Sequence, residues 1–234
     1  MPRRTIAVIP ARAGSKRVPR KNLRIFNGRP LLTWSIMAAL DGHPVDDVIV
    51  STDDSECARL AAAHGAQHYE RPDELAGDTA AMLDVLRHVV EEYRTVSGND
   101  VEFVVLLQPT SPLRERGLIA DGLARIRADE KATCLQTVFP VRLFTGRIVN
   151  GYWRGDYPES TRSQDLPTLY VPSGTLYIYR YDRTIAMGDA WGNHVLPLVQ
   201  DPDTVVNIDE EADFTRLAQV AARHSHRYAY LLGS

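Results

Sequence analysis

The sequence predicts an α/β fold in which helices cover both faces of a mainly parallel sheet. Apolar runs rich in β-branched residues, at Thr5–Ile9 and Glu102–Leu107, are typical of strands buried on both faces. Between such runs lie segments with helical apolar spacing, for example Thr79–Arg94. This alternation indicates parallel strands joined by crossover helices, and sheets of this kind bind ligands beyond the carboxyl ends of their strands.

The elements of the first part of the chain follow one another regularly. After the first strand comes a long basic loop, Ala11–Asn27, because this stretch has Gly14 and Pro19 but no apolar period. Helical spacing predicts helices at Pro30–Leu40, Asp54–His64, Thr79–Arg94 and Leu113–Ala128, and runs rich in apolar residues predict strands at Asp46–Val50, Glu102–Leu107 and Thr133–Val138. We also expect a short strand at Gln67–Glu70, between the second and third of these helices.

The regular pattern stops at Pro140. Glycines, prolines and exposed-type aromatics such as Tyr152 and Trp153 indicate an irregular hairpin, or arm, over Val141–Tyr170. A strand at Thr175–Tyr179 and a helix at Asp209–Arg223 follow. The acidic residues that begin this helix would stabilise the positive N-terminal end of its dipole. We therefore expect one domain, residues 1–234, that carries the arm at 141–170.

Composition excludes several classes of protein. The 234 residues include 27 Lys and Arg against 30 Asp and Glu, a net charge of −3 that disfavours a nucleic-acid binder. The two cysteines, Cys57 and Cys134, have no disulfide-scaffold or metal spacing, so we expect core residues. There is no apolar run of about 18 residues and no export-type segment. We expect a cytoplasmic protein that contacts no membrane.

The basic loop carries the first candidate site. Its PARAGSKRVPRKN segment, residues 10–22, follows a buried strand and surrounds Gly14 with lysines and arginines. Glycine lets backbone N–H groups approach a ligand and the cations donate hydrogen bonds, which suits a polyphosphate. Neither a P-loop nor a dinucleotide motif is present. A solvated basic loop is the alternative interpretation.

Two further segments carry polar groups. In LLQPTSPLR, Gln108 follows a buried strand and begins a loop whose backbone is fixed by prolines, which would present its side chain at the edge of the sheet. The alternative interpretation is an ordinary strand end followed by a turn that a Ser or Thr hydroxyl stabilises. In VVNIDEEAD, Asp209 stands at the expected start of the last helix, where acidic residues usually cap. Opposite a polyphosphate, however, a carboxylate is what a Mg²⁺ site requires.

These three segments, in this order, resemble the acylneuraminate (CMP-sialic acid) cytidylyltransferase family. IPARAGSKRVPRKN is the most specific element, and ERPDELAGDTA, LLQPTSPLR, QDLP and NIDEEAD support it across nearly the whole chain. The resemblance implies a Rossmann-like nucleotidyltransferase fold with a mixed sheet and an arm that reaches into the partner of a homodimer. It also implies transfer from CTP to a nonulosonic acid, assisted by Mg²⁺, with release of pyrophosphate.

The resemblance assigns roles by position. Lys21, Arg12 and Lys16 are the expected catalytic cations, and Lys21 is nearest the chemistry. Arg12, Ser15, Lys16, Asn22, Arg71 and Ala80 are expected to bind the nucleotide. Gln108, Tyr177 and Arg162 are expected to bind the sugar acid, and Asp209 and Asn207 the metal.

The chain departs from the family pattern at a few positions. Asn207 stands where members often have aspartate, and Ser163 where an arginine is frequent, with Arg162 one residue earlier. Arg142 or Arg147 of the arm are candidates to supply the missing cation. The open alternatives are another acid acceptor (legionaminate, pseudaminate, Kdn or a non-sugar acid), a non-catalytic nucleotide-binding module, and a nucleic-acid binder.

Overall fold

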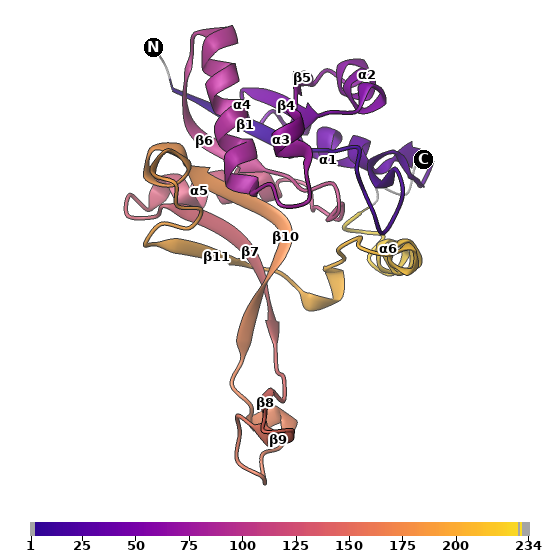
Figure 1. The fold of residues 1–234 in the computed structure, drawn as a ribbon, viewed down its shortest axis with the longest axis vertical. Coiled ribbons are helices and arrows are strands. Elements are labelled where there is room, and N and C mark those ends of the chain that lie inside the picture. Colours follow the sequence, from indigo (N-terminus) through magenta and orange to yellow (C-terminus); the bar gives the residue numbers. More distant parts are fainter. Residues whose placement is uncertain (1–2, 229, 231–234) are drawn as a thin grey trace.

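The computed structural model describes residues 3–228 and 230. Its main sheet has the strand order β11-β7-β10-β6-β1-β4-β5 (Figure 1). Strand β10 runs antiparallel to both neighbours, and the other pairs are parallel, so the sheet is mixed as expected. The sheet strands are β1 (Arg3–Pro10), β4 (Asp47–Thr52), β5 (Gln67–Glu70), β6 (Asp100–Leu106), β7 (Cys134–Val141), β10 (Leu169–Arg180) and β11 (Val195–Val199).

Helices cover both faces of this sheet. One face packs against apolar residues of α1 (Leu31–Leu40), α2 (Ser55–Ala63) and α5 (Leu118–Ala128). The other face packs against α4 (Met82–Ser97), whose Leu86, Val89 and Tyr93 are buried. A third cluster joins α6 (Glu211–Arg223) to the outer side of α1 through Leu217 and Trp34. Cys57 and Cys134 are free, buried core residues, as expected.

Several predicted boundaries and omissions need correction; among them, β10 begins at Leu169 rather than Thr175, and α6 at Glu211 rather than Asp209. Helix α4 begins three residues later than predicted, at Met82, and α5 begins at Leu118 rather than Leu113. A one-turn helix, α3 (Asp73–Ala76), and the edge strand β11 lie in segments without a prediction. The basic loop contains a 3₁₀ turn at Lys21–Leu23 and strand β2 (Ile25–Phe26), which pairs with β3 (Arg29–Pro30).

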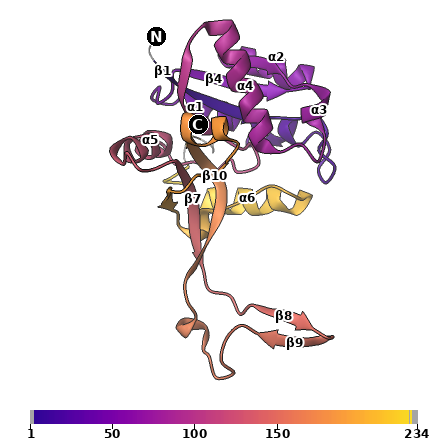
Figure 2. The same ribbon diagram turned by 60° about the vertical axis from the view of Figure 1, so that its left-hand side comes forward.

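An arm projects from the body between β7 and β10. These two strands pair from Cys134 and Tyr179 out to Val141 and Leu169, so they form its stalk. Beyond the stalk lie the small hairpin of β8 (Gly146–Val149) and β9 (Tyr152–Gly155) and a 3₁₀ turn at Ser163–Asp165. The arm extends far from the sheet in both ribbon views (Figures 1 and 2).

No helix among the described residues has the length and apolar character needed to cross a lipid bilayer.

Candidate active site

Two cavities lie side by side at the carboxyl ends of the parallel strands and share Gln108. The first, of about 470 Å³, lies where the basic loop, the segment after β5, the loop after β6 and the start of the α6 region converge. Its lining residues are Pro10, Arg12, Ser15, Lys16, Arg17, Val18, Lys21, Asn22, Arg71, Asp78, Met82, Gln108, Pro109, Thr110 and Asp209. Eight of the predicted site residues therefore meet here: Arg12, Ser15, Lys16, Lys21, Asn22, Arg71, Gln108 and Asp209.

The basic loop is held in shape by its own polar groups. The Asn22 side chain donates to the Arg12 carbonyl oxygen at 3.1 Å, and the Ala13 N–H donates to the Asp53 carboxylate at 2.7 Å. Arg20, which precedes the 3₁₀ turn, has a left-handed backbone with φ of 53° and pairs with Glu56 outside the cavity. Asn22, which was expected to touch the nucleotide, thus also fixes the loop that carries the cations.

Asp78 is a cavity residue that sequence reasoning missed. Its carboxylate forms ion pairs with Lys16 and with Arg12, the latter at 2.8 Å. These hydrogen bonds from Lys16 and Arg12 hold the pKa of Asp78 below its usual range. Asp78 lies in the ERPDELAGDTA segment, between Arg71 and Ala80. An acidic residue between two predicted nucleotide-binding residues was the one feature of the sequence that could have identified it as a partner of the loop cations. Any anion that binds Arg12 and Lys16 must exchange with it.

Lys21 is the most enclosed cation of the basic loop that faces the cavity. Its ammonium donates to the Ile208 carbonyl at 2.6 Å and lies 3.9 Å from the Asp209 carboxylate, while only 14% of the side chain is exposed. Burial lowers the pKa of Lys21, and the negative charge of Asp209 opposes that shift. Electrostatic interactions of such a poorly solvated cation with a ligand are stronger than those of an exposed lysine.

Asp209 is not the helix cap that its position suggested. Helix α6 begins at Glu211, and its capping box is formed by Glu210 and Asp213. The Asp213 carboxylate accepts from the backbone N–H groups of both Asp209 and Glu210, each at 2.7 Å. The Asp209 carboxylate instead faces the first cavity and accepts a 2.8 Å hydrogen bond from the Asn207 amide.

Arg71 has an unsatisfied donor in the first cavity. The residue is 4% exposed, and its Nε donates to Ser51 at a long 3.4 Å. Its buried Nη2 has no hydrogen-bond partner among the described residues. Burial lowers the pKa of Arg71 to about 10, so the guanidinium remains charged at neutral pH. Arg71 lines the first cavity, but Nη2 itself has almost no accessible surface, so an acceptor supplied by a ligand would reach this costly unpaired donor only after a small shift of the side chain.

The second cavity, of about 370 Å³, lies at the base of the arm. The predicted residues Gln108, Tyr177 and Asn207 line it, together with Phe139 and Val171 of the stalk strands. Arg216 of α6, which sequence reasoning did not single out, supplies a cation and donates to the Val205 carbonyl at 3.5 Å. Its position in the second turn of an ordinary amphipathic helix gave no local signal.

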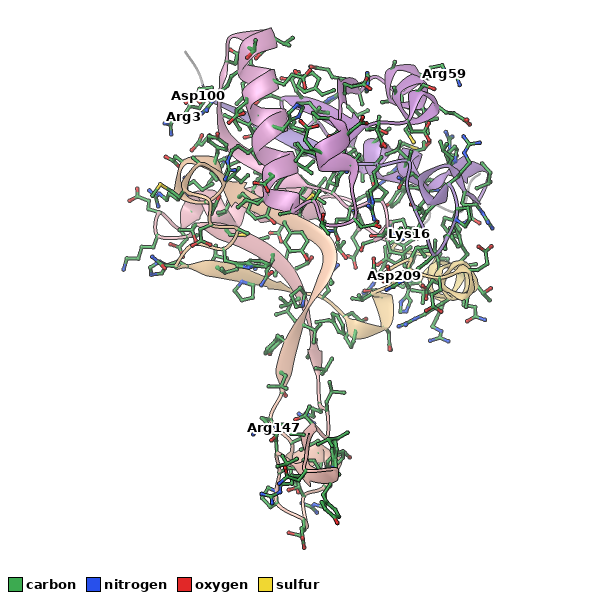
Figure 3. The ribbon with its side chains drawn as sticks, in the orientation of Figure 1. Arg3, Lys16, Arg59, Asp100, Arg147 and Asp209 are labelled. Carbon is green, nitrogen blue, oxygen red and sulfur yellow. The ribbon has the colours of Figure 1, made fainter. Side chains whose placement is uncertain are left out.

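Two predicted residues line neither cavity. Ala80 lies two residues from Asp78, and its N–H donates to the Gly77 carbonyl at 3.4 Å. Arg162 lies in the arm and forms a double hydrogen bond with Asp165, at 2.7 and 3.2 Å. Figure 3 shows Lys16 and Asp209 close together where the basic loop approaches α6, and Arg147 far out on the arm, away from both.

The arrangement suits Mg²⁺ brought by a polyphosphate. The described residues contain no cluster of three or more His, Cys, Asp or Glu side chains that could hold a metal on their own. Two carboxylates line the first cavity: Asp78 is paired with Arg12 and Lys16, whereas Asp209 is not used as a cap and has no ion pair shorter than 3.9 Å among the described residues. Magnesium is usually held by one or two carboxylates together with substrate phosphates and water. The donor set therefore fits a substrate-delivered ion.

This fold is that of the α/β nucleotidyltransferases. A solved CMP:2-keto-3-deoxy-manno-octonic acid synthetase complexed with CTP superposes with a TM-score of 0.67 at 19% identity, over 94% of this chain and 99% of that one. A solved 4-diphosphocytidyl-2C-methyl-D-erythritol synthase gives 0.67 at 13% identity, over the same shares of the two chains. At these identities the likeness establishes the fold alone.

The chain belongs to the cytidylyltransferase family, whose model matches residues 6–226. It is 30% identical to the N-acylneuraminate cytidylyltransferase of Escherichia coli O18:K1:H7, over 89% of this chain and 50% of that protein. It is 32% identical to the CMP-N,N'-diacetyllegionaminic acid synthase of Legionella pneumophila, over 90% and 93% of the two chains. A Campylobacter jejuni pseudaminic acid cytidylyltransferase is 28% identical over 97% of this chain and 100% of its own length.

The chain thus spans about half the length of the Escherichia coli relative and nearly all of the other two. The activity that family membership supports is cytidylyl transfer.

Proposed function

We propose that this protein transfers CMP from CTP to a nonulosonic, sialic-type acid. The anomeric hydroxyl oxygen of the acid attacks the α-phosphorus, the α–β phosphoanhydride bond breaks, pyrophosphate leaves, and the hydroxyl proton is lost. The observation that carries the proposal is the first cavity, where loop cations, the unpaired Arg71 donor and the Asp209 carboxylate meet. Relatives named for sialic, legionaminic and pseudaminic acids support the acceptor class.

Different residues of the chain are proposed to bind different parts of the nucleotide. Arg71 donates to the carbonyl oxygen of cytosine, and the backbone at Ala80 contributes the neighbouring wall of the base site. Arg12, Ser15 and Lys16 bind the phosphates after Asp78 has been displaced from the two cations. Lys21 stabilises the charge that develops as pyrophosphate departs, because a fixed, partly buried cation needs no reorganisation during the reaction.

Asp209 is proposed to hold Mg²⁺, and Asn207 to orient the Asp209 carboxylate or to hold a water of the ion. When bound, the metal neutralises phosphate charge and assists the departure of pyrophosphate. With Asp209 as the one carboxylate proposed to hold the ion, most of the remaining ligands would come from CTP and water.

The acid is proposed to occupy the second cavity. Gln108, shared by both cavities, and Tyr177 contact the sugar, while Arg216 is the nearest available cation for its carboxylate in the same chain. Since CTP is an intracellular nucleotide, we propose that the reaction takes place in the cytoplasm.

A homodimer is proposed because the arm exposes large apolar side chains. Ile148 is 77%, Tyr152 76% and Trp153 59% exposed, and an exposed apolar surface on a projecting hairpin is typical of an interface. Arg162 lies on this arm, so it would reach a substrate only in the partner's site. Arg142 and Arg147 are candidates for the same reason.

The proposal is tested by pyrophosphate release from CTP and Mg²⁺ with a panel of acids: N-acetylneuraminate, legionaminate, pseudaminate, Kdn and a non-sugar 2-keto acid. We expect turnover with at least one nonulosonic acid, and none when UTP replaces CTP. Binding of CTP without turnover of any acid would favour a non-catalytic nucleotide-binding module. Turnover with the non-sugar acid alone would keep the cytidylyltransferase and overturn the acceptor class.

A further inference from the structure

Arg114 is a fully buried arginine that forms no ion pair. Only 1% of its surface is exposed, and no carboxylate of a described residue lies within ion-pair distance of its guanidinium. Burial lowers the pKa of Arg114 to about 10, so the side chain is still a cation at neutral pH. A buried charge of this kind is expensive and is retained only where hydrogen bonds compensate for the lost water.

Three acceptors from three separate segments provide that compensation. Nε donates to the Thr175 carbonyl at 2.9 Å, Nη1 to the Ser35 hydroxyl at 2.9 Å, and Nη2 to the Gln108 carbonyl at 2.7 Å. Thr175 belongs to β10, Ser35 to α1, and Gln108 to the loop after β6. The planar guanidinium fork thus fixes the backbone of Gln108 relative to a sheet strand and a helix.

The Gln108 side chain is constrained from the opposite direction. Gly174 has a φ of +77°, and a Cβ built there would lie 3.0 Å from the Gln108 Oε1 and 2.8 Å from the Ser111 hydroxyl. The side chain therefore approaches the backbone of β10 at a point where only glycine leaves room. Gln108 is held by its carbonyl on one side and fits against a bare backbone on the other, at the boundary of the two cavities.

We infer that Arg114 is a positioning residue: by fixing the backbone of Gln108, it orients the Gln108 side chain toward the sugar acid. The inference rests on the proposed function, because it takes Gln108 as a contact to the acceptor. A lysine retains the charge but cannot donate to three acceptors in one plane. At least one of the three partners, the Gln108 carbonyl among them, then loses its hydrogen bond. Displacement of a substrate-contacting group by about 1 Å is enough to lower the rate strongly.

The test is a double-mutant cycle of Arg114→Lys with Gln108→Ala, read as kcat/KM for the acid and as the Kd for CTP in its absence. We expect Arg114→Lys to lower acceptor kcat/KM by roughly 10- to 100-fold, with a smaller change in CTP affinity. In the Gln108→Ala background the same substitution should have little further effect, because its target is gone.

Arg180→Lys is the matched control. Arg180 also donates to backbone carbonyls, those of Ala132 and Ile126, and has 12% of its side chain exposed, but it lies away from both cavities. This variant should lower the thermal unfolding temperature without moving acceptor kcat/KM. An equal loss from Arg114→Lys in both backgrounds, or a parallel loss of CTP affinity, would overturn the inference and leave Arg114 a structural residue.

Ser35→Ala gives the same test if Arg114→Lys does not fold. It removes one acceptor of the guanidinium and leaves Arg114 in place, so it should give a smaller acceptor-selective loss that also vanishes in the Gln108→Ala background. Additive losses in that cycle overturn the inference. If the wild-type protein turns over no acid, the proposed function fails and the inference with it. Turnover by the wild type together with additive cycles rejects the inference alone.

Discussion

The two cavities that meet at Gln108 are built on different principles. The first is formed by loops that leave the carboxyl ends of buried parallel strands, and its cations are held by backbone carbonyls and by Asp78. The second is formed at the base of a projecting arm, and much of its lining is exposed. Most residues that line the first cavity are buried or half-buried, whereas the lining of the second includes exposed residues that an arm from another copy could cover. Under the proposed function, this difference means that nucleotide recognition is preorganised within one chain, whereas acceptor recognition depends on the surroundings of the arm.

Replacement of Asp209 should have the largest effect on the first cavity. Asp209→Ala should abolish turnover while the protein stays folded, because the helix cap is supplied by Glu210 and Asp213. Glu210→Ala removes the other half of the capping box and leaves the hydrogen bond from the Asp209 N–H to Asp213 in place; as the matched control it should cost about 1 kcal/mol of stability yet retain activity. Pyrophosphate release and thermal unfolding, measured on both variants, decide the matter. An active Asp209→Ala protein at ordinary Mg²⁺ would remove this carboxylate from the metal site.

Removal of the arm should disable the second cavity and leave the first intact. Joining β7 to β10 by a short turn in place of residues 142–168 should give a monomer that binds CTP but does not turn over the acid. Sedimentation and calorimetry with CTP measure the two properties. Val96→Ala, at an exposed apolar residue of α4, is the control and should change neither. A full-length protein that sediments as a monomer at assay concentration would contradict the dimer.

Lys21→Ala should lower kcat by roughly 10²–10³-fold, the loss typical of a donor that acts on developing charge, with a smaller effect on CTP affinity. Lys131→Ala, at an exposed lysine in the turn before β7, should have no effect. Because burial lowers the pKa of Lys21, the ammonium loses its proton at lower pH than an ordinary lysine. Activity should fall on the alkaline side accordingly, and Lys21→Arg should move that limb to higher pH. Near-normal turnover of Lys21→Ala would place Lys21 outside the chemistry.

Arg71→Ala should weaken CTP binding by roughly tenfold or more, since a lost hydrogen bond from a charged group costs about 1.5–3 kcal/mol. Any affinity for UTP should fall by a similar factor, because uracil carries the same C2 carbonyl oxygen as cytosine. Arg59→Ala, at the exposed arginine of α2, is the control (Figure 3). Titration calorimetry with both nucleotides provides the measurement. Unchanged CTP affinity would show that the unpaired Arg71 donor faces no ligand.

Arg216→Ala should have the smallest effect, a rise in the KM for the acid of about two- to fivefold, as expected for one exposed ion pair. The KM for CTP should not change. Arg223→Ala, near the end of the same helix, serves as the control. If the KM for the acid is unaffected, the acid's carboxylate is bound by other groups, and the arm cations become the leading candidates.

The sequence predicts the interior of the fold well and its boundaries less well. Strands such as Thr5–Ile9 and Asp46–Val50 were found because an apolar run buried in a parallel sheet differs clearly from a loop. Strand β11 was missed because it carries Pro197 and is half exposed, which the sheet tolerates only at its edge. Helix α5 starts late because the preceding segment turns Arg114 into the core, a contact between distant segments that no local pattern shows.

The same division applies to the candidate site. Residues on the loops after β1 and β6 were brought together as expected, because parallel topology places those loops at one edge. Other features of the site depend on side-chain packing that sequence spacing does not show. These are the ion pairs of Asp78, the capping box that leaves Asp209 free of a capping role, and the position of Arg216 at the second cavity.

The position of the arm has a consequence for how the chain can change over time. Because β7 and β10 pair antiparallel, the arm is the connection of a long hairpin, and the sheet pairing of these strands does not depend on the residues beyond the stalk. The entropy of closing a connection grows only with the logarithm of its length, about 0.6 kcal/mol for each doubling. Insertions, deletions and substitutions beyond the stalk therefore disturb the stability of the sheet little. If the arm acts on the acceptor as proposed, its sequence can change, and the acceptor preference with it, without altering the loops that line the first cavity.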